Sequence, residues 1–171
     1  RPRSYTVMDW YTNVLGTQHP DLWRDVWGSG ERVPVRDDNL ALRGRVISEG
    51  VLAPEALTDT WVAFGDLPYV PRGDPDAEEV WFGVQWRGGA RISRVVAHLG
   101  SQADPTRPSL RAPVLEVLPA SVPSRWVAVD GEVHVDGPTT TFVFGASDVV
   151  AVRLRVNDDA RAPTCRELEV F

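Results

Sequence analysis

The sequence predicts an all-β protein built as a β-sandwich. Short runs rich in Val, Ile, Thr, Phe and Trp recur along the chain, and clusters of Pro, Gly, Asp and Ser separate them at the spacing of a sandwich. Helical periodicity is confined to two short stretches. The 171 residues are enough for one domain with a full core, but not for two of ordinary size.

Eight strands are predicted from residue 79 onward. The first two are joined by an expected turn at residues 87–90, where Gly88 and Gly89 lie. A single helical turn is predicted at residues 54–59. The strands are expected at residues 79–86, 92–99, 113–118, 126–129, 132–135, 139–144, 149–156 and 166–171.

Residues 1–36 are predicted to be an N-terminal extension or the remnant of a preceding domain, and residues 37–171 a single β domain. The first segment holds a strand-like run at residues 4–12, a short helix at 20–27 and a strand at 32–36. Since the chain begins Arg1-Pro2-Arg3, we expect it to be a piece of a longer protein with neighbouring domains.

The charge of the chain bears on its partners. The net charge is −6, whereas proteins that bind the phosphate backbone usually carry a basic excess. We therefore expect no nucleic-acid partner and no binding to anionic membranes.

No apolar run approaches the roughly 20 residues of a membrane-spanning helix. All 18 basic residues are Arg, which suggests a GC-rich, actinobacterial genome.

Few side chains suit catalysis. His19, His98 and His134 are far apart in sequence, and a satisfied or exposed strand histidine is the usual case for the last two. The sequence holds no His-Glu-x-x-His motif, no Gly-x-Ser-x-Gly motif and no phosphate-binding glycine loop. Cys165, the only cysteine, is expected to be a small, half-buried strand residue.

Two carboxylate pairs could be considered for acid–base work. Asp74 with Asp76, and Asp158 with Asp159, lie in predicted loops, where Asp more often forms turns. A glycosidase needs two carboxyl groups that face each other across a cleft, and neither pair is placed for that. The sequence therefore predicts a protein that is not an enzyme.

Four stretches, taken in order, resemble the discoidin or coagulation-factor C-type domain, whose fold is called galactose-binding-like. Residues 39–42 (NLAL) resemble its opening motif, and residues 54–59 (PEALTD) resemble its early loop. Residues 81–95 (WFGVQWRGGARISRV) resemble its core hairpin, and residues 166–171 (RELEVF) its closing strand. The resemblance implies a discoidin-like jelly roll similar to family 32 carbohydrate-binding modules.

The resemblance also implies a structural cation, Ca²⁺ or Na⁺, that ties the early loop to the last strand. The matching positions are the side chains of Asp59 and Glu167 and the carbonyls of Ala56 and Arg166, all oxygen donors as a hard cation requires. The sequence departs from the family after Asp59, where Thr60 replaces the usual Gly. In the alternative reading, Asp59 caps a turn and Glu167 is solvated or paired with an Arg.

In the related modules, the sugar site lies at one end of the barrel. By position, it corresponds here to residues 61–76, 100–111 and 157–164. Aromatic rings there could stack on a sugar, Arg could donate to hydroxyls, and Asp or Asn could accept; alternatively, Trp61 packs inside. The candidate ligand-binding residues are Trp61, Tyr69, Arg72, Asp74, Arg107, Arg111, Asn157 and Asp158.

The resemblance and the loop contents together predict a non-catalytic carbohydrate-binding module. We expect it to belong to a larger secreted or cell-surface carbohydrate-active protein, with a polysaccharide or glycan as partner. The alternative is a structural or protein-interaction domain of the same fold without a sugar site. A membrane-binding discoidin domain is disfavoured because it usually has a basic rim, whereas this chain is acidic.

Overall fold

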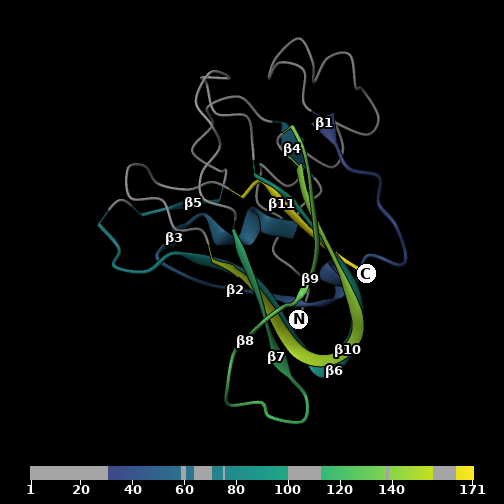
Figure 1. Ribbon diagram of the computed structural model, residues 1–171. Helices are drawn as coiled ribbons and strands as arrows, with labels where there is room; N and C mark the ends of the chain where they lie inside the picture. Colours follow the sequence, from purple (N-terminus) through teal and green to yellow (C-terminus); the bar gives the residue numbers. More distant parts are fainter. Residues whose placement is uncertain are drawn as a thin grey trace, which may run out of the picture.

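The computed structural model describes residues 31–58, 61–63, 71–74, 76–99, 113–137, 139–155 and 165–171 (Figure 1). Over these ranges the regular structure is β-strand, with two short 3-10 helices, η2 (Leu40–Arg43) and η3 (Pro54–Thr58). No helix in these ranges could cross a membrane. The strands are β1 (Glu31–Arg32), β2 (Arg45–Glu49), β3 (Val51–Leu52), β4 (Trp61–Ala63), β5 (Arg72–Gly73), β6 (Trp81–His98), β7 (Val114–Pro119), β8 (Val127–Ala128), β9 (Gly131–Asp136), β10 (Thr139–Arg155) and β11 (Glu167–Val170).

Two long antiparallel strands, β6 and β10, organise the sheet. Near the middle of β10 the register shifts twice, between Val143 and Ser147 and between Val149 and Ala151. Such irregularities bend a strand pair, and Figure 1 shows both ribbons curving there. On one side of the bend, β6 pairs with β2 and β10 pairs with β7. On the other side, β6 pairs with β11 and β10 pairs with β9.

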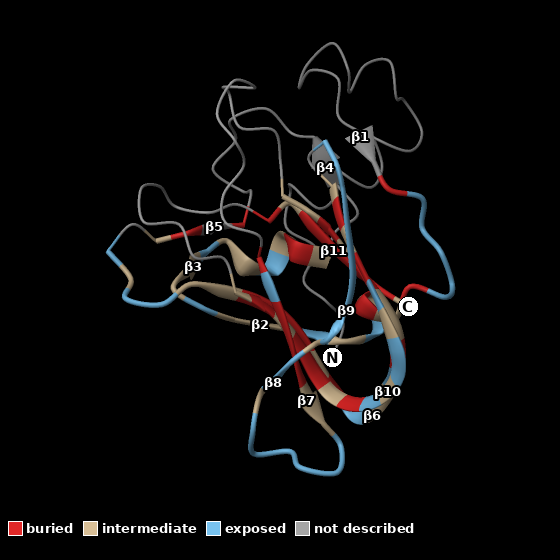
Figure 2. Ribbon diagram, in the orientation of Figure 1, coloured by how far each residue is buried: buried red, intermediate tan, exposed pale blue. Residues whose placement is uncertain are grey.

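The core lies inside this bend and draws residues from both sides of it. Phe82 and Leu154 come from the side of β2 and β7, while Phe142 and Leu168 come from the side of β9 and β11; all four are buried. Figure 2 shows buried residues in red along β6, β7, β10 and β11. The apolar faces of the two sides therefore form one core, as in a sandwich.

The all-β prediction is confirmed, but one predicted turn is wrong. Residues 87–90 lie inside the continuous strand β6. Ala90 pairs with Val149 of β10 and Gln85 with Ala151, and residues 86–89 lie in the irregularity between these two pairs. Gly89 adopts a φ of 75° without reversing the chain. The predicted strands 139–144 and 149–156 are likewise one strand, β10. A glycine in a strand pattern marks either a turn or a bend, and here it marks a bend.

The remaining predicted elements are found close to their expected places. The runs at 113–118, 132–135 and 166–171 correspond to β7, β9 and β11, and the helical turn at 54–59 corresponds to η3. The run at 126–129 contains only the two-residue strand β8, and the run predicted at 32–36 forms only the last residue of β1. The predicted strand at 4–12 and helix at 20–27 lie outside the described residues.

Residues 31–36 lie against the β domain. β1 pairs with β4, Val33 is buried, and the Arg36 guanidinium lies 4.9 Å from the centre of the Phe171 ring. The division of the chain at residues 36 and 37 stays a prediction.

Asn39, the first residue of the NLAL motif, joins the start of the domain to its last strand. Its side-chain oxygen accepts hydrogen bonds from the backbone N–H of Ala41, at 3.1 Å, and of Val170, at 3.0 Å. The first bond caps η2, and the second satisfies a donor of β11. Because Asn39 is buried, water cannot replace either bond.

We therefore expect Asn39→Ala to lower the free energy of unfolding by about 2–4 kcal/mol, since it removes a helix cap and leaves a buried donor unsatisfied. Urea denaturation measures the loss. Asp37→Ala, two residues earlier and exposed, is the matched control and should change stability by less than about 0.5 kcal/mol. Equal stability of the two variants would contradict this role of Asn39.

Cys165 lies directly before β11 and is fully buried, whereas the sequence predicted a half-buried residue. Its thiol lies 3.6 Å from the backbone carbonyl of Glu167. Burial, and secondarily the charge of Glu167, raises the pKa of the Cys165 thiol well above its usual range. The folded protein thus holds the protonated thiol, which is a poor nucleophile.

Native Cys165 should therefore react with a disulfide reagent such as DTNB at pH 8 at least about 100-fold more slowly than in urea-unfolded protein. The absorbance of released thiolate measures both rates.

The elevated pKa of Cys165 also predicts that the free energy of unfolding falls as the pH rises above about 9, because only the thiol of the unfolded protein then ionises. Rapid labelling of the native protein would contradict the burial.

Candidate functional site

The bend in β6 and β10 brings the two ends of this strand pair to the same end of the sandwich. Trp81 pairs with Arg155 at one end of the ladder, and His98 pairs with Thr139 at the other. η3 packs against both β2 and β11, which belong to opposite sides of the bend. We call the end that lies away from the bend the stem end, because the predicted ligand loops leave the sandwich there.

Backbone hydrogen bonds join the stems of all three predicted loops. The N–H of Cys165, which follows the loop at 157–164, donates to the carbonyl of Pro71 in the loop at 61–76, at 3.1 Å. The N–H of Arg166 donates to the carbonyl of His98, which precedes the loop at 100–111, at 2.7 Å. The structure thus brings together the points from which these loops start or end.

The predicted ligand-binding residues differ in how far the structure describes them. Trp61 and Arg72 belong to β4 and β5, which pair with β1 and β3 respectively. Asp74 is half-buried, and its carboxylate accepts a hydrogen bond from the N–H of Asp76 at 3.0 Å. One oxygen of Asp74 therefore serves its own turn, as Asp commonly does. Outside the described residues lie Tyr69, Arg107, Arg111, Asn157 and Asp158.

The predicted cation ligands fall on two elements that the fold packs together. Ala56 is half-buried in η3, and Arg166 and Glu167 stand at the start of β11, which contacts η3. Asp59 lies outside the described residues, directly after η3. Glu167 is 0% exposed, so the alternative in which it is solvated is wrong.

The predicted ligands at Glu167, Ala56 and Arg166 are all oxygen atoms, which are the donors that a hard cation such as Ca²⁺ prefers. A buried carboxylate is stabilised by a cation, and carbonyls from a tight turn complete such a shell. Over the described ranges, no group of three or more His, Cys, Asp or Glu side chains is arranged as metal ligands. Among the described residues, the further oxygen donors for such a cation would be the backbone carbonyls of Ala56 and Arg166.

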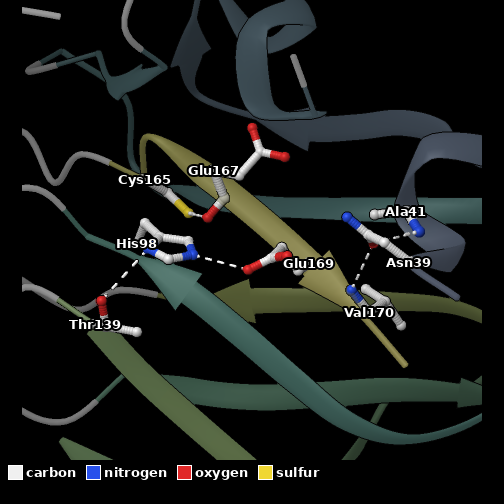
Figure 3. A network of polar contacts seen from close by, with 8 residues as sticks. All are labelled: Asn39, Ala41, His98, Thr139, Cys165, Glu167, Glu169 and Val170. Carbon is white, nitrogen blue, oxygen red and sulfur yellow. Dashed lines mark hydrogen bonds and ion pairs between the residues drawn. The ribbon is translucent and has the colours of Figure 1, made fainter. Parts of the chain in front are cut away.

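A polar network at the stem end was not predicted (Figure 3). His98 Nε2 lies 3.0 Å from the Glu169 carboxylate, and His98 Nδ1 lies 3.4 Å from the Thr139 hydroxyl. The side chains of His98 and Glu169 are only 16% and 9% exposed. The network ties together β6, β10 and β11 beside the loop stems. His98 is thus the satisfied strand histidine expected from the sequence.

Comparison with known proteins places this geometry in context. No family model and no curated protein matches the sequence. A chitosan-binding module from a Paenibacillus sp. IK-5 chitosanase/glucanase, solved with chitotriose, is similar with a TM-score of 0.58 and 20% identity over 78% of this chain and 99% of that one. CpGH89CBM32-5 of Clostridium perfringens, solved with GalNAc-β-1,3-galactose, has a TM-score of 0.55 and 15% identity, over 78% and 99%.

A third similar structure is the lectin domain of lectinolysin in complex with Lewis b, with a TM-score of 0.58 and 16% identity over 81% of this chain and 98% of that one. The three matched chains are covered almost completely, so the likeness extends over whole domains. These likenesses and the bent seven-stranded sheet show that the chain has the discoidin, or galactose-binding-like, β-sandwich fold of the family 32 carbohydrate-binding modules.

Proposed function

We propose that this chain is a non-catalytic carbohydrate-binding module of a larger secreted or cell-surface carbohydrate-active protein. Its partner is a polysaccharide or glycan, bound at the stem end. The observation that carries the proposal is that the stems of the three predicted loops come together, joined by the bonds from Cys165 to Pro71 and from Arg166 to His98. A rigid sandwich that presents converging loops is a common scaffold for binding sites.

The chemistry of the loop residues supports a sugar as the ligand. Arg72 would donate paired hydrogen bonds to neighbouring hydroxyls, and Asp74 retains acceptor capacity beyond its bond to Asp76. Tyr69 and Trp61 would stack on the apolar face of a ring. Three structures of the same fold were solved with chitotriose, GalNAc-β-1,3-galactose and Lewis b, which gives a first set of probes.

A glycan array followed by calorimetry with those three saccharides tests the proposal. We expect the protein to bind at least one glycan at millimolar or lower concentration, and we expect Arg72→Ala to weaken that binding about tenfold or more, because it removes charge-assisted hydrogen bonds. The matched control is Arg91→Ala, since Arg91 forms an exposed ion pair with Asp148 at the bend. Absence of any retained glycan would overturn the proposal.

We further propose that a structural Ca²⁺ is held by the carboxylates of Asp59 and Glu167 and the carbonyls of Ala56 and Arg166. The support is the full burial of Glu167 and the packing of η3 on β11. A cation at this place would stabilise the early loop against the last strand. It would order the stem end of the sandwich and take no part in chemistry.

Thermal unfolding with Ca²⁺ and with a chelator tests the cation. At a Ca²⁺ concentration about 100 times the Kd, the midpoint should rise by about 5–10 °C, because the ion binds only the folded state. In Glu167→Gln the response to Ca²⁺ should be lost, while Glu132→Gln, an exposed residue of β9, should keep it. An unchanged midpoint in the parent protein, at any Ca²⁺ concentration, would argue against the site.

The second candidate is a structural or protein-interaction domain without a sugar site. One observation favours it: β9 pairs with β10 and with no other strand of the described residues, and its Val133 and Val135 are 48% and 62% exposed. Exposed apolar side chains on an edge strand suit contact with another protein surface. A protein that binds no glycan on the array would favour this candidate.

A further inference from the structure

Two tryptophans that the loop prediction does not use lie together on the outward side of the sheet. Phe82 and Val84 of β6 point into the core, so Trp81, between Phe82 and the preceding loop, points outward. Trp126 precedes β8, which is separated from β6 by β10 and β7, yet its ring centre lies 6.2 Å from that of Trp81. The two tryptophan side chains therefore approach each other across the outward faces of β7 and β10.

An arginine and a glutamate lie with these rings. The Arg153 guanidinium is 4.5 Å from the centre of the Trp126 ring and 5.3 Å from that of Trp81. Arg153 Nε donates to Glu116 at 2.6 Å, and both side chains are largely buried. We call the surface formed by Trp81, Trp126, Arg153 and Glu116 the indole face.

Further bonds fix the orientation of the indole face. Trp81 Nε1 donates to the Glu49 carboxylate at 3.0 Å, which holds the ring across the boundary of β2 and β6. Arg155 donates to Glu116 at 3.3 Å and lies 3.4 Å from Glu79. Trp81 and Trp126 are both half-buried as residues, so each keeps some surface for a partner. A platform held in place in this way loses little entropy on binding.

The charges and rings at the indole face favour a sugar over a phosphate-rich ligand or a lipid. Carboxylates at Glu49 and Glu79 accept hydrogen bonds, Arg155 donates them, and the rings offer flat apolar surface. Phosphate-rich ligands are opposed by these carboxylates, and lipid tails by the exposed charges. Pyranose rings have one apolar C–H face and a rim of hydroxyls, which matches indole surrounded by donors and acceptors.

The position of the indole face relates it to the stem end. Trp81 and Arg155 are paired neighbours, and Arg155 ends β10, two residues before the predicted ligand loop at 157–164. The face thus begins where that loop leaves the sandwich. A chain of sugars held at the stem end could therefore continue onto the indoles.

We propose that the indole face is an extension of the glycan-binding site that contacts further residues of an uncharged oligosaccharide chain. This inference rests on the proposed function, because it places the terminal sugar at the stem end. The inference adds that the affinity for an oligosaccharide increases with its length, because further sugar rings stack on Trp81 and Trp126.

Calorimetry with length-matched probes tests the inference. N-acetylchitohexaose, cellohexaose and xylohexaose are each compared with their monosaccharide. We expect Trp126→Ala to weaken hexasaccharide binding by about three- to tenfold and to leave monosaccharide binding unchanged, because one stacking contact is lost. The matched control is Val127→Ala, an exposed neighbour in β8, which should change neither. Trp126→Phe should restore most of the binding.

The outcomes separate this inference from the proposed function. If Trp126→Ala binds both lengths as the parent does, the indole face is not part of the site, while the stem end still binds sugar. If the parent binds the two lengths equally, the extension is also overturned. If the parent binds no saccharide, both proposals fail. Circular dichroism and the unfolding midpoint confirm that Trp126→Ala is folded, so that any loss reflects binding.

Discussion

The bend in the β6–β10 ladder is the constraint on which the rest of the structure depends. A straight strand of 18 residues would extend about 60 Å and could not cover its own apolar face. The register shifts around Ser147 and Val149 bend the pair instead, and the apolar faces of its two sides meet in one core. The same bend carries both ends of the ladder to the stem end, so the geometry of the core also sets the place of the candidate site.

The closing strand β11 joins that core to the stem end at an electrostatic cost. Its four residues are all buried, yet two of them are glutamates. A buried carboxylate is tolerated only with a compensating partner. Glu169 has His98 at 3.0 Å, and Asn39 satisfies the neighbouring backbone donor of Val170. The polar chemistry of β11 is thus part of what holds the loop stems together.

Local patterns in the sequence sufficed to predict strands near β7, β9 and β11, where β-forming residues cluster, but not β2 to β5, for which no strand was predicted. They did not suffice to show that residues 87–90 continue a strand, since Gly88 and Gly89 suit a turn as well as a bend. Contacts such as those of His98 with Glu169 and of Trp81 with Trp126 depend on register between distant segments. The order of the four family-like stretches indicated which segments of the chain are ligand loops. It did not indicate which face of the sheet lies next to those loops.

Placement of a site at loops or on a strand face has different consequences for recognition. The loops at the stem end can change in sequence and length with little effect on the ladder, so they suit the selection of a particular terminal sugar. Trp81 and Arg153 are fixed by the pairing of β6 with β10, and their position can shift only if the ladder does. A surface fixed in this way suits contacts common to many glycans, such as stacking on a pyranose ring. Selectivity would then reside at the end of the sandwich, and affinity for long chains on its face.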